Sequence, residues 1–319
     1  MAKVASRPFF LGGNDKLGKK GVEYEFLLEE NGFDIGKWSD DDDVIMLNLV
    51  PWTERHAELA RQYKVTSAQF GPQSFGDREN ADFLLELPTL REVSIALFRV
   101  EDLSALGRLT QLRSLRIDLE IWRMGDNFSP VDFSALEKLE HADMMMCPAF
   151  ESVLDCKTIK ELAVRNECDG RLRDLDLSRL PRLQELELDH CPKLRSVSLH
   201  PKAQVQALSL ALCGSYKIDW RRMGPDLLYL RLGGRLTFPL EDILNAPRLR
   251  ELHTIEIRKL PPLGFLRKLE RLRTVFLFAA SGPKVSAEDD ALVREINARP
   301  RHSERQVRRK AGTRPSDVP

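Results

Sequence analysis

The chain has 319 residues, of which 42% are hydrophobic, so it can bury a large core without disulfides or metals. Its 49 basic and 49 acidic side chains balance, which removes the usual electrostatic reason to expect nucleic acid or an anionic membrane as the main partner. The apolar run Phe9–Leu11 is too short for a secretory signal, and no stretch approaches the ~20 apolar residues of a membrane span. With an odd count of five cysteines, we expect reduced thiols in a cytoplasmic protein.

The N-terminal segment 1–43 contains the sequence GNDKLGKK at 13–20. Its Gly-x-x-x-x-Gly-Lys spacing is that of a phosphate-binding loop, but Lys20 stands where the Ser or Thr that holds magnesium belongs. A nucleotide fold also needs several βαβ units after the loop, for which 1–43 has no room. We therefore predict an N-terminal cap and expect the run Asp40–Asp43 to be solvated charge, because it lacks the alternating ligands of a calcium loop. A nucleotide-binding or enzymatic function of the Gly/Lys segment remains an alternative.

Apolar residues recur at a fixed interval from residue 44 to residue 278. The starts at 90 and 112, and those at 183, 205 and 227, are 22 residues apart. A copy near Leu249 fits either Leu249-Leu252-Thr254, which keeps the interval, or Leu252-Ile255-Ile257, which is more apolar, and the sequence does not choose. A constant period of 20–29 residues predicts a solenoid, here of about eleven coils. The other units of the type Leu-x-x-Leu-x-Leu begin at Val44, Val65, Leu90, Leu112, Leu139, Ile159, Leu183, Val205, Leu227 and Leu272.

Within each unit, alternate residues of a short strand point to opposite sides, so the three apolar residues enter the core and their neighbours face solvent. The first unit is predicted to bury Val44, Leu47 and Leu49. One coil cannot bury its apolar side alone, so stacking of neighbours provides the stability. The spacers 52–63, with Thr53 as N-cap, and 239–245 are predicted to be helical, whereas the alternating segment 194–199 should be extended.

The segment LQELELDHCPKL at 183–194 matches the pattern Leu-x-x-Leu-x-Leu-x-x-Asn/Cys-x-Leu, and Cys147, Cys191 and Cys213 stand at the Asn/Cys position. On these residues the chain resembles the leucine-rich-repeat family, cytoplasmic type, with repeats of about 22 residues over roughly three quarters of its length. The resemblance implies an α/β solenoid, with a curved parallel β-sheet on the concave face and short helices and extended segments on the convex face. It further implies binding of a protein partner rather than catalysis, with no cofactor.

The cysteines at the Asn/Cys position are expected to point inward and donate to backbone carbonyls. No Cys-x-x-Cys or Cys/His pair with zinc spacing occurs in the chain, so we do not expect a metal site. Cys156 lies outside the register and is predicted to be a free thiol.

The third, fifth and seventh residues of each unit should face outward on the concave sheet, where we expect the partner to bind. The most acidic part is the triplet on 185–189, followed by a small uncharged strip at 207–211 and then by Tyr229 and Arg231, which are typical interface residues. The spacer 112–139 is five residues longer than the common interval and should form a loop, whose large apolar groups are either a binding knob or packing for the loop itself. The predicted partner-binding residues are Arg116, Asp118, His141, Asp143, Arg165, Glu185, Glu187, Asp189, Tyr229, Arg231 and Trp122.

The domain organisation is then a cap (1–43), a solenoid (44–278), a C-terminal capping helix (279–298) and a disordered basic tail (299–319). The helix should begin after the capping sequence Ser286-x-x-Asp289 and cover Phe276 and Phe278 of the last strand. The tail has seven basic residues and almost no apolar ones, so nucleic-acid binding through it is a second alternative. An immunity protein, an effector and an adaptor would share this sequence pattern, and no membrane contact is expected.

Overall fold

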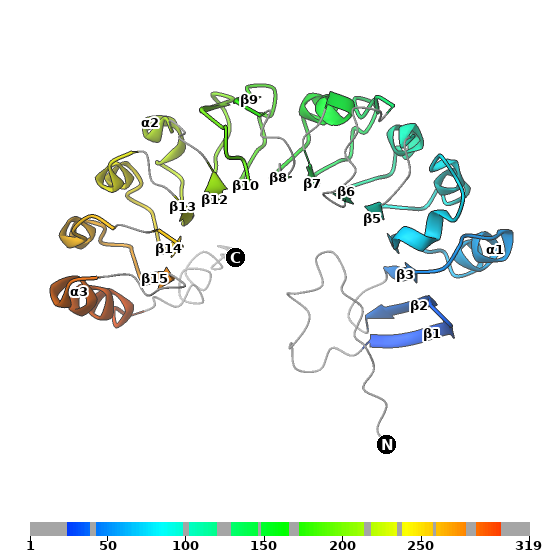
Figure 1. Ribbon diagram of the computed structural model, residues 1–319, viewed down its shortest axis with the longest axis horizontal. Helices are drawn as coiled ribbons and strands as arrows, with labels where there is room; N and C mark the ends of the chain where they lie inside the picture. Colours follow the sequence, from blue (N-terminus) through cyan, green and yellow to red (C-terminus); the bar gives the residue numbers. More distant parts are fainter. Residues whose placement is uncertain are drawn as a thin grey trace, which may run out of the picture.

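A single open sheet of 13 strands runs through the computed structural model, which describes residues 24–38, 43–97, 102–119, 129–145, 148–165, 172–213, 218–234, 238–257, 260–278 and 285–300. Eleven of the strands are parallel and line the inner curve of an arc (Figure 1). This confirms the predicted solenoid and its curved parallel sheet on the concave face. The parallel strands are β3 (Val44–Asn48), β4 (Ser67–Phe70), β5 (Glu92–Leu97), β6 (Ser114–Leu119), β7 (His141–Met145), β8 (Glu161–Arg165), β10 (Glu185–Asp189), β12 (Ala207–Cys213), β13 (Tyr229–Gly234), β14 (Glu251–Ile255) and β15 (Thr274–Phe278).

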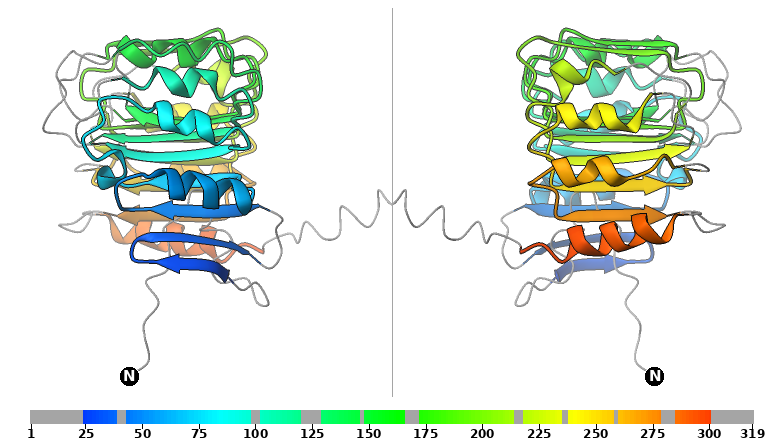
Figure 2. Two further views of the ribbon diagram at one scale, coloured as in Figure 1. Left: turned by 90° about the vertical axis from the view of Figure 1, so that its right-hand side faces the viewer. Right: turned by 90° about the vertical axis from the view of Figure 1, so that its left-hand side faces the viewer.

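The outer side of the arc carries short helices and extended segments, which stack in the same order as the strands (Figures 1 and 2). The α-helix α1 (Glu54–Gln62) begins after Thr53 as predicted, and the Thr53 N–H donates to His56 Nδ1 at 3.2 Å. The predicted extended segment is β11 (Ser196–Leu199), which pairs in parallel with β9 (Asp174–Leu177). The remaining convex elements are the short α-helix α2 (Trp220–Met223) and the 3-10 helices η2 (Pro72–Phe75), η3 (Asp82–Glu86), η4 (Ser104–Arg108), η6 (Pro148–Asp155), η7 (Leu240–Asn245) and η8 (Gly264–Lys268).

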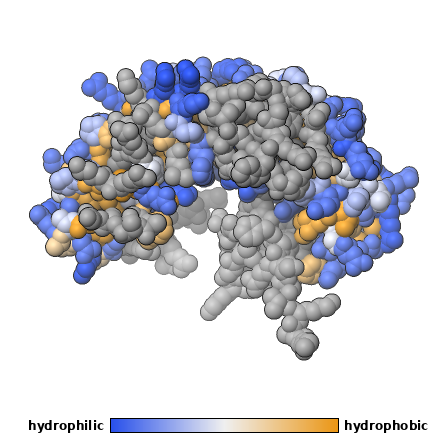
Figure 3. Space-filling view, in the orientation of Figure 1, coloured by the Kyte–Doolittle hydropathy of each residue, from blue (hydrophilic) through white to orange (hydrophobic). Residues whose placement is uncertain are grey.

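Apolar side chains of successive coils form one continuous core. Leu186 of β10 pairs in register with Leu162 of β8 and Leu208 of β12, and none of the three is more than 2% exposed. Each coil therefore completes the core of the next, and stability comes from the stacking of neighbours. In the space-filling view, hydrophilic side chains cover the outer rim, whereas apolar residues show toward the two ends of the arc (Figure 3).

The first coil is one residue out of the predicted register. In β3 the fully buried side chains are those of Met46 and Asn48, and Ile45 is 7% exposed, whereas Leu47 is half-buried and Leu49 is 43% exposed. The predicted core set of Val44, Leu47 and Leu49 is therefore wrong. The reason is that β3 pairs with β2 on one edge and β4 on the other, and a slip of one residue moves every side chain of a strand to the opposite face.

Near Leu249 the structure selects the first of the two registers that the sequence left open. Leu252 and Thr254 of β14 pair with Leu230 and Leu232 of β13. Leu249 and Leu252 are fully buried and Thr254 is 2% exposed. Pairing with β13 thus places a threonine in the core, because the fixed interval of the coils decides which residues point inward.

Different elements close the two ends of the solenoid. At one end, the hairpin of β1 (Tyr24–Glu30) and β2 (Phe33–Trp38) adds two antiparallel strands to β3. At the other end, α3 (Ala287–Asn297) packs against β15 and begins at Ser286, whose hydroxyl accepts from the Asp289 N–H at 3.0 Å. Asn297 completes this contact: its Oδ1 accepts from the Val275 N–H at 2.7 Å, and its amide donates to the Val275 carbonyl at 3.1 Å.

The helix α3 does not cover the phenylalanines of the last strand. It buries Leu292 and Ile296, whereas Phe276 and Phe278 remain 51% and 47% exposed. The predicted covering role is therefore wrong. Successive residues of a strand alternate between its faces, so Phe276 and Phe278 lie on the side of β15 opposite to the buried Val275, which α3 contacts.

Candidate protein-binding face

The register of the sheet aligns the outward side chains of successive coils into rows across the concave face. Every strand pair from β5 to β15 is parallel, so the third, fifth and seventh residues of each unit meet their counterparts in the next coil. Ten of the predicted partner-binding residues lie in these rows, and Trp122 lies outside the described residues. The row of third residues is Glu92, Ser114, His141, Glu161, Glu185, Ala207, Tyr229, Glu251 and Thr274, and the row of fifth residues is Ser94, Arg116, Asp143, Ala163, Glu187, Ser209, Arg231, His253 and Phe276.

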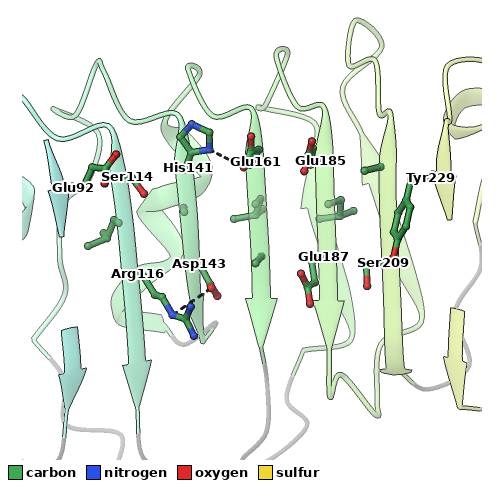
Figure 4. Close-up of a pocket in the computed structure, with 16 residues that line it drawn as sticks. Glu92, Ser114, Arg116, His141, Asp143, Glu161, Glu185, Glu187, Ser209 and Tyr229 are labelled. Carbon is green, nitrogen blue, oxygen red and sulfur yellow. Dashed lines mark ion pairs between the residues drawn. The ribbon is translucent and has the colours of Figure 1, made fainter. Parts of the chain in front are cut away.

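A groove of about 660 Å³ follows these two rows from Glu92 to Tyr229. Figure 4 shows its polar side chains projecting from neighbouring strands toward the open side of the sheet. Its floor contains small residues where Ala163, Ala207 and Ser209 stand. On β12, small residues therefore lie between the longer side chains of β10 and β13.

The N-terminal half of the groove is internally paired. Arg116 Nε lies 2.7 Å from Asp118 Oδ2 and 3.6 Å from Asp143 Oδ2. Arg165 bridges the same two carboxylates, at 3.0 Å from Asp143 and 3.4 Å from Asp118. Burial raises the pKa of the Asp143 carboxyl although Arg165 and Arg116 lie beside it. These four predicted binding residues thus form an ion-pair network of their own across β6, β7 and β8.

The next pair along the groove is His141 with Glu161. His141 Nδ1 lies 2.8 Å from Glu161 Oε2 (Figure 4). The hydrogen bond to Glu161 raises the pKa of the His141 imidazole, against the opposing effect of burial. Protonation of His141 is therefore more favourable than for a free imidazole, and the protonated ring forms an ion pair with Glu161.

The acidic side chains of β10 differ from those of β6 to β8. Glu185 and Glu187 form no ion pair with any described residue, whereas Asp189 lies 3.0 Å from His190 Nδ1. Burial and the neighbouring Glu161 carboxylate raise the pKa of Glu185. Two carboxylates thus face the groove without an ion-pair partner, and desolvation makes the charge of Glu185 costly.

Beside them, β12 and β13 contribute small and aromatic groups. Ser209 is 8% exposed, and its hydroxyl has no hydrogen-bond partner in the described part of the chain. In Figure 4 the Tyr229 ring points toward Ser209, and both residues line the groove. Arg231 pairs in register with Ser209, and its buried Nε likewise has no acceptor among the described residues. The acidic triplet on β10, the small uncharged strip on β12 and the two residues Tyr229 and Arg231 are therefore neighbours in space.

The structure also brings together an aromatic cluster on this face, of which the sequence analysis missed His253. The ring centroids of Tyr229 and His253 are 5.1 Å apart, those of His253 and Phe276 are 5.8 Å apart, and those of Phe276 and Phe278 are 6.4 Å apart with nearly parallel planes. Phe276 and Phe278 were expected on the last strand but beneath α3. The open register near Leu249 left the fifth position of that unit, His253, unassigned.

The cysteines of the described residues are buried free thiols. Cys213 Sγ donates to the Leu188 and Ala211 carbonyls at 3.4 Å, and Cys191 Sγ donates to the Asp189 carbonyl at 3.4 Å, as expected for the Asn/Cys position. Cys156 forms no disulfide, as predicted, and neither do the other two. Burial raises the pKa of its thiol to about 12, and it donates to a backbone carbonyl at 3.1 Å. Cys147 lies outside the described residues.

The groove contains side chains of the types used in nucleophilic catalysis. Ser114, His141 and Glu161 are neighbours in one row, in the order of a nucleophilic triad, but no hydrogen bond joins Ser114 to His141. Among the described residues, no group of three metal-ligating side chains occurs. The segment 13–20 and the tail from residue 301, on which the two alternatives depend, lie outside the described residues.

Across the described part of the chain, no helix combines the length and the apolar character that crossing a bilayer demands.

Stacked coils of 20–27 residues, a parallel sheet on the inner curve and 3-10 helices on the outer curve give this chain the fold of leucine-rich-repeat proteins. No protein-family model and no curated protein sequence matches it. Solved structures of the same class do. An internalin of Listeria monocytogenes is 13% identical with a TM-score of 0.45, and the match covers 73% of this chain and 64% of that one.

The leucine-rich-repeat domain of the type III effector XopL is 18% identical, with a TM-score of 0.39, over 72% of this chain and 75% of that one. A leucine-rich-repeat protein of Leptospira interrogans is 11% identical, with a TM-score of 0.26, over 77% and 91%. The chain spans less than two thirds of the internalin's length. At such identities the likeness concerns the fold alone, and the class rests on the coils of the chain itself.

Proposed function

We propose that this chain is a non-enzymatic binding module that recognises a protein partner through the C-terminal half of its concave face. The observation that carries the proposal is the contrast between the two halves of the groove. Asp118, Asp143 and Glu161 form ion pairs with Arg116, Arg165 and His141. Glu185 and Glu187, one strand further, form no ion pair with any described residue, and only longer-range interactions link them to His141 and Arg116.

Charged side chains that are unpaired and partly desolvated destabilise the unbound protein, because their hydration is reduced and no other interaction compensates for the loss. A partner that supplies the missing charges recovers this free energy on binding. The strands hold the acceptors at fixed positions, so little conformational entropy is lost when the partner docks. Tyr229 and Arg231 next to the acidic residues are of the types that contribute most at protein interfaces.

The test is a charge reversal of the acidic strand. The variant Glu185→Lys, Glu187→Lys, Asp189→Lys is used as bait in a lysate of the source organism, and captured proteins are identified by mass spectrometry. We expect a partner of the unchanged protein to be lost. The matched control reverses three exposed acids of convex helices, Glu58, Glu151 and Glu241, and should retain that partner.

Circular dichroism establishes that both variants keep the fold. Capture of the same partner by the concave variant would move the binding site away from β10. Loss of the partner by both variants would show that net charge, rather than the concave face, governs the association.

A further inference from the structure

We infer that the partner presents one extended segment in which a basic side chain enters an acidic slot over β12 and a large apolar side chain, about four residues away, covers an aromatic patch on β14 and β15. The inference rests on the proposed function and specifies the chemistry of the partner. The acidic slot is formed by Glu185, Glu187, Ala207, Ser209 and Tyr229. The aromatic patch is formed by His253, Phe276 and Phe278.

The negative charges of the acidic slot are complementary to a cation. Carboxylates only accept hydrogen bonds, and Glu185 and Glu187 have no ion-pair partner in the described ranges. Two residues apart on one strand, they lie on the same face at about 7 Å from each other. A lysine ammonium or an arginine guanidinium between them would form charge-assisted hydrogen bonds, which are about twice as strong as neutral ones.

A hydroxyl without a hydrogen-bond partner in the floor of the slot is independent evidence for a ligand. The Ser209 hydroxyl is more than nine-tenths buried, lines the groove and has no partner in the described part of the chain. Ala207 beside it leaves room above the sheet. A hydroxyl in this position can accept a third hydrogen bond from the cation, and the face of the Tyr229 ring is a further favourable surface for it.

Arg231 fixes which side of the slot the cation occupies. It pairs in register with Ser209, so its positive charge repels a basic group from the β13 side and leaves the β10 side, next to Glu185 and Glu187. The Arg231 Nε has no acceptor among the described residues. A segment that crosses from the slot toward β15 passes over Arg231, and its backbone carbonyls are suitable acceptors.

The exposed rings of the aromatic patch are suited to contact an apolar side chain of the partner. Phe276 and Phe278 are 51% and 47% exposed, on a face where most neighbours are polar. Their rings stack on each other at 6.4 Å, and His253 extends the surface toward Tyr229 at the edge of the slot. Burying such rings stabilises a complex through the hydrophobic effect. The patch is continuous with the acidic slot, so one segment can contact both.

The sheet sets the distance between the two contacts. Ser209 on β12 and Phe276 on β15 belong to the same row, three strand steps apart. At about 4.8 Å per step the separation is roughly 14 Å, and an extended segment advances about 3.3 Å per residue. The basic and the apolar residue are therefore about four positions apart, with the segment running along the solenoid and across its strands.

The experiment titrates the full chain with fluorescein-labelled pentapeptides and follows anisotropy. The probe has the sequence Lys-Gly-Ser-Gly-Trp, and a second probe carries arginine in place of lysine. A third carries norleucine, which keeps the stem and removes the charge. A fourth places lysine and tryptophan side by side. We expect the first two probes to bind about tenfold more tightly than the last two, because a charge-assisted contact and the apolar contact are each worth about a factor of ten.

The variant Glu185→Gln, Glu187→Gln should lose the preference for the basic probes, and Phe276→Ser should abolish the preference for the correct spacing. Both variants replace outward-facing side chains of the concave sheet that are not part of the core. The variant Glu58→Gln, Glu241→Gln is the matched control: it removes two exposed carboxylates from convex helices and should leave the preference intact. The better of the lysine and arginine probes identifies the basic residue.

Equal binding of the norleucine probe, an unchanged preference in the double glutamine variant, or no binding of any probe up to about 1 mM would overturn the inference. Self-association of the full chain that Phe276→Ser abolishes would also overturn it, because the patch would then belong to a second copy. If the charge-reversed variant loses its native partner while the probes show no preference, the proposed function stands and this inference fails.

Discussion

Replacing Gly107 with alanine is expected to destabilise the solenoid although no polar contact is lost. Gly107 lies in the 3-10 helix η4, where a Cβ would stand 2.1 Å from the Asp132 carbonyl oxygen of the next coil. Ordinary carbon–oxygen contacts are about 3.3 Å or longer. The two coils would have to separate by about 1 Å, and the obstacle is backbone rather than a side chain that can rotate. Gly264 in η8 is the matched control, since its added Cβ would meet nothing within 4 Å.

The size of the effect follows from two opposing contributions. Overpacking against a rigid neighbour costs about 1–3 kcal/mol. Alanine in place of glycine also restricts the unfolded chain, which stabilises the fold by about 0.4–1 kcal/mol where the native backbone tolerates it. Gly264→Ala should therefore be neutral or slightly stabilising. The free energies of unfolding of the two variants should differ by about 2 kcal/mol.

Urea unfolding followed by circular dichroism measures this difference. Because a long array of coils can lose two-state behaviour, hydrogen exchange with mass spectrometry should accompany it. In Gly107→Ala, exchange should accelerate in peptides from 102–119 and 129–145 and stay unchanged near β14. Equal stability of the two variants would refute the close approach of the coils at Gly107.

Three further predictions concern a titration, a thiol and an end of the solenoid. The His141 pKa in the folded chain should lie above the ordinary value of 6.5 by NMR and fall in Glu161→Gln. This ion pair contributes its full stability below pH 6.5, and the contribution is lost as the pH rises through the raised pKa of the folded state. A measured His141 pKa of 6.5 in the folded chain would contradict the prediction. The Cys156 thiol, buried and with a pKa of about 12, should resist a thiol reagent at pH 8 until the chain unfolds, so rapid labelling of the native protein would count against its burial. Asn297→Ala should leave the N–H and carbonyl of Val275 without partners, at a cost of about 1–3 kcal/mol, and exchange should rise in β15 but not in β7.

The period of the sequence was sufficient to predict the fold. Coils that share a core must place apolar residues at the same phase, and this requirement is visible without coordinates. It also gave the correct third and fifth residues of the concave face from Ser114 to Arg231, because the strands alternate there. The prediction was wrong for the seventh residues Met145 and Ala211, which are 5% and 6% exposed, because the alternation ends with the strand. It failed at Leu49 because residues 44–50 are apolar at every position except Asn48, and such a continuous run fits two phases. Only pairing with β2 and β4 decides between them.

The site was less predictable, because the sequence does not show which charges neutralise one another. Arg116 and Glu187 are both charged fifth residues of their units, but only Arg116 has an ion-pair partner among the described residues. That difference depends on side chains in neighbouring coils. Phe276 was recognised as outward-facing, and the error was to expect α3 over it. The sequence does not state on which side of the last strand a terminal helix will pack.

Neighbouring strands of the concave sheet lie at a constant distance from one another, so positions along this face change in steps of one coil. The β1–β2 hairpin packs on the first parallel strand and α3 on the last, so a change in the number of interior coils would leave both contacts in place. Duplicating one coil between β12 and β15 would move the aromatic patch one strand spacing, about 4.8 Å, further from the acidic slot. The separation between two chemically different contacts is thus adjustable in discrete steps, and neither contact has to be rebuilt.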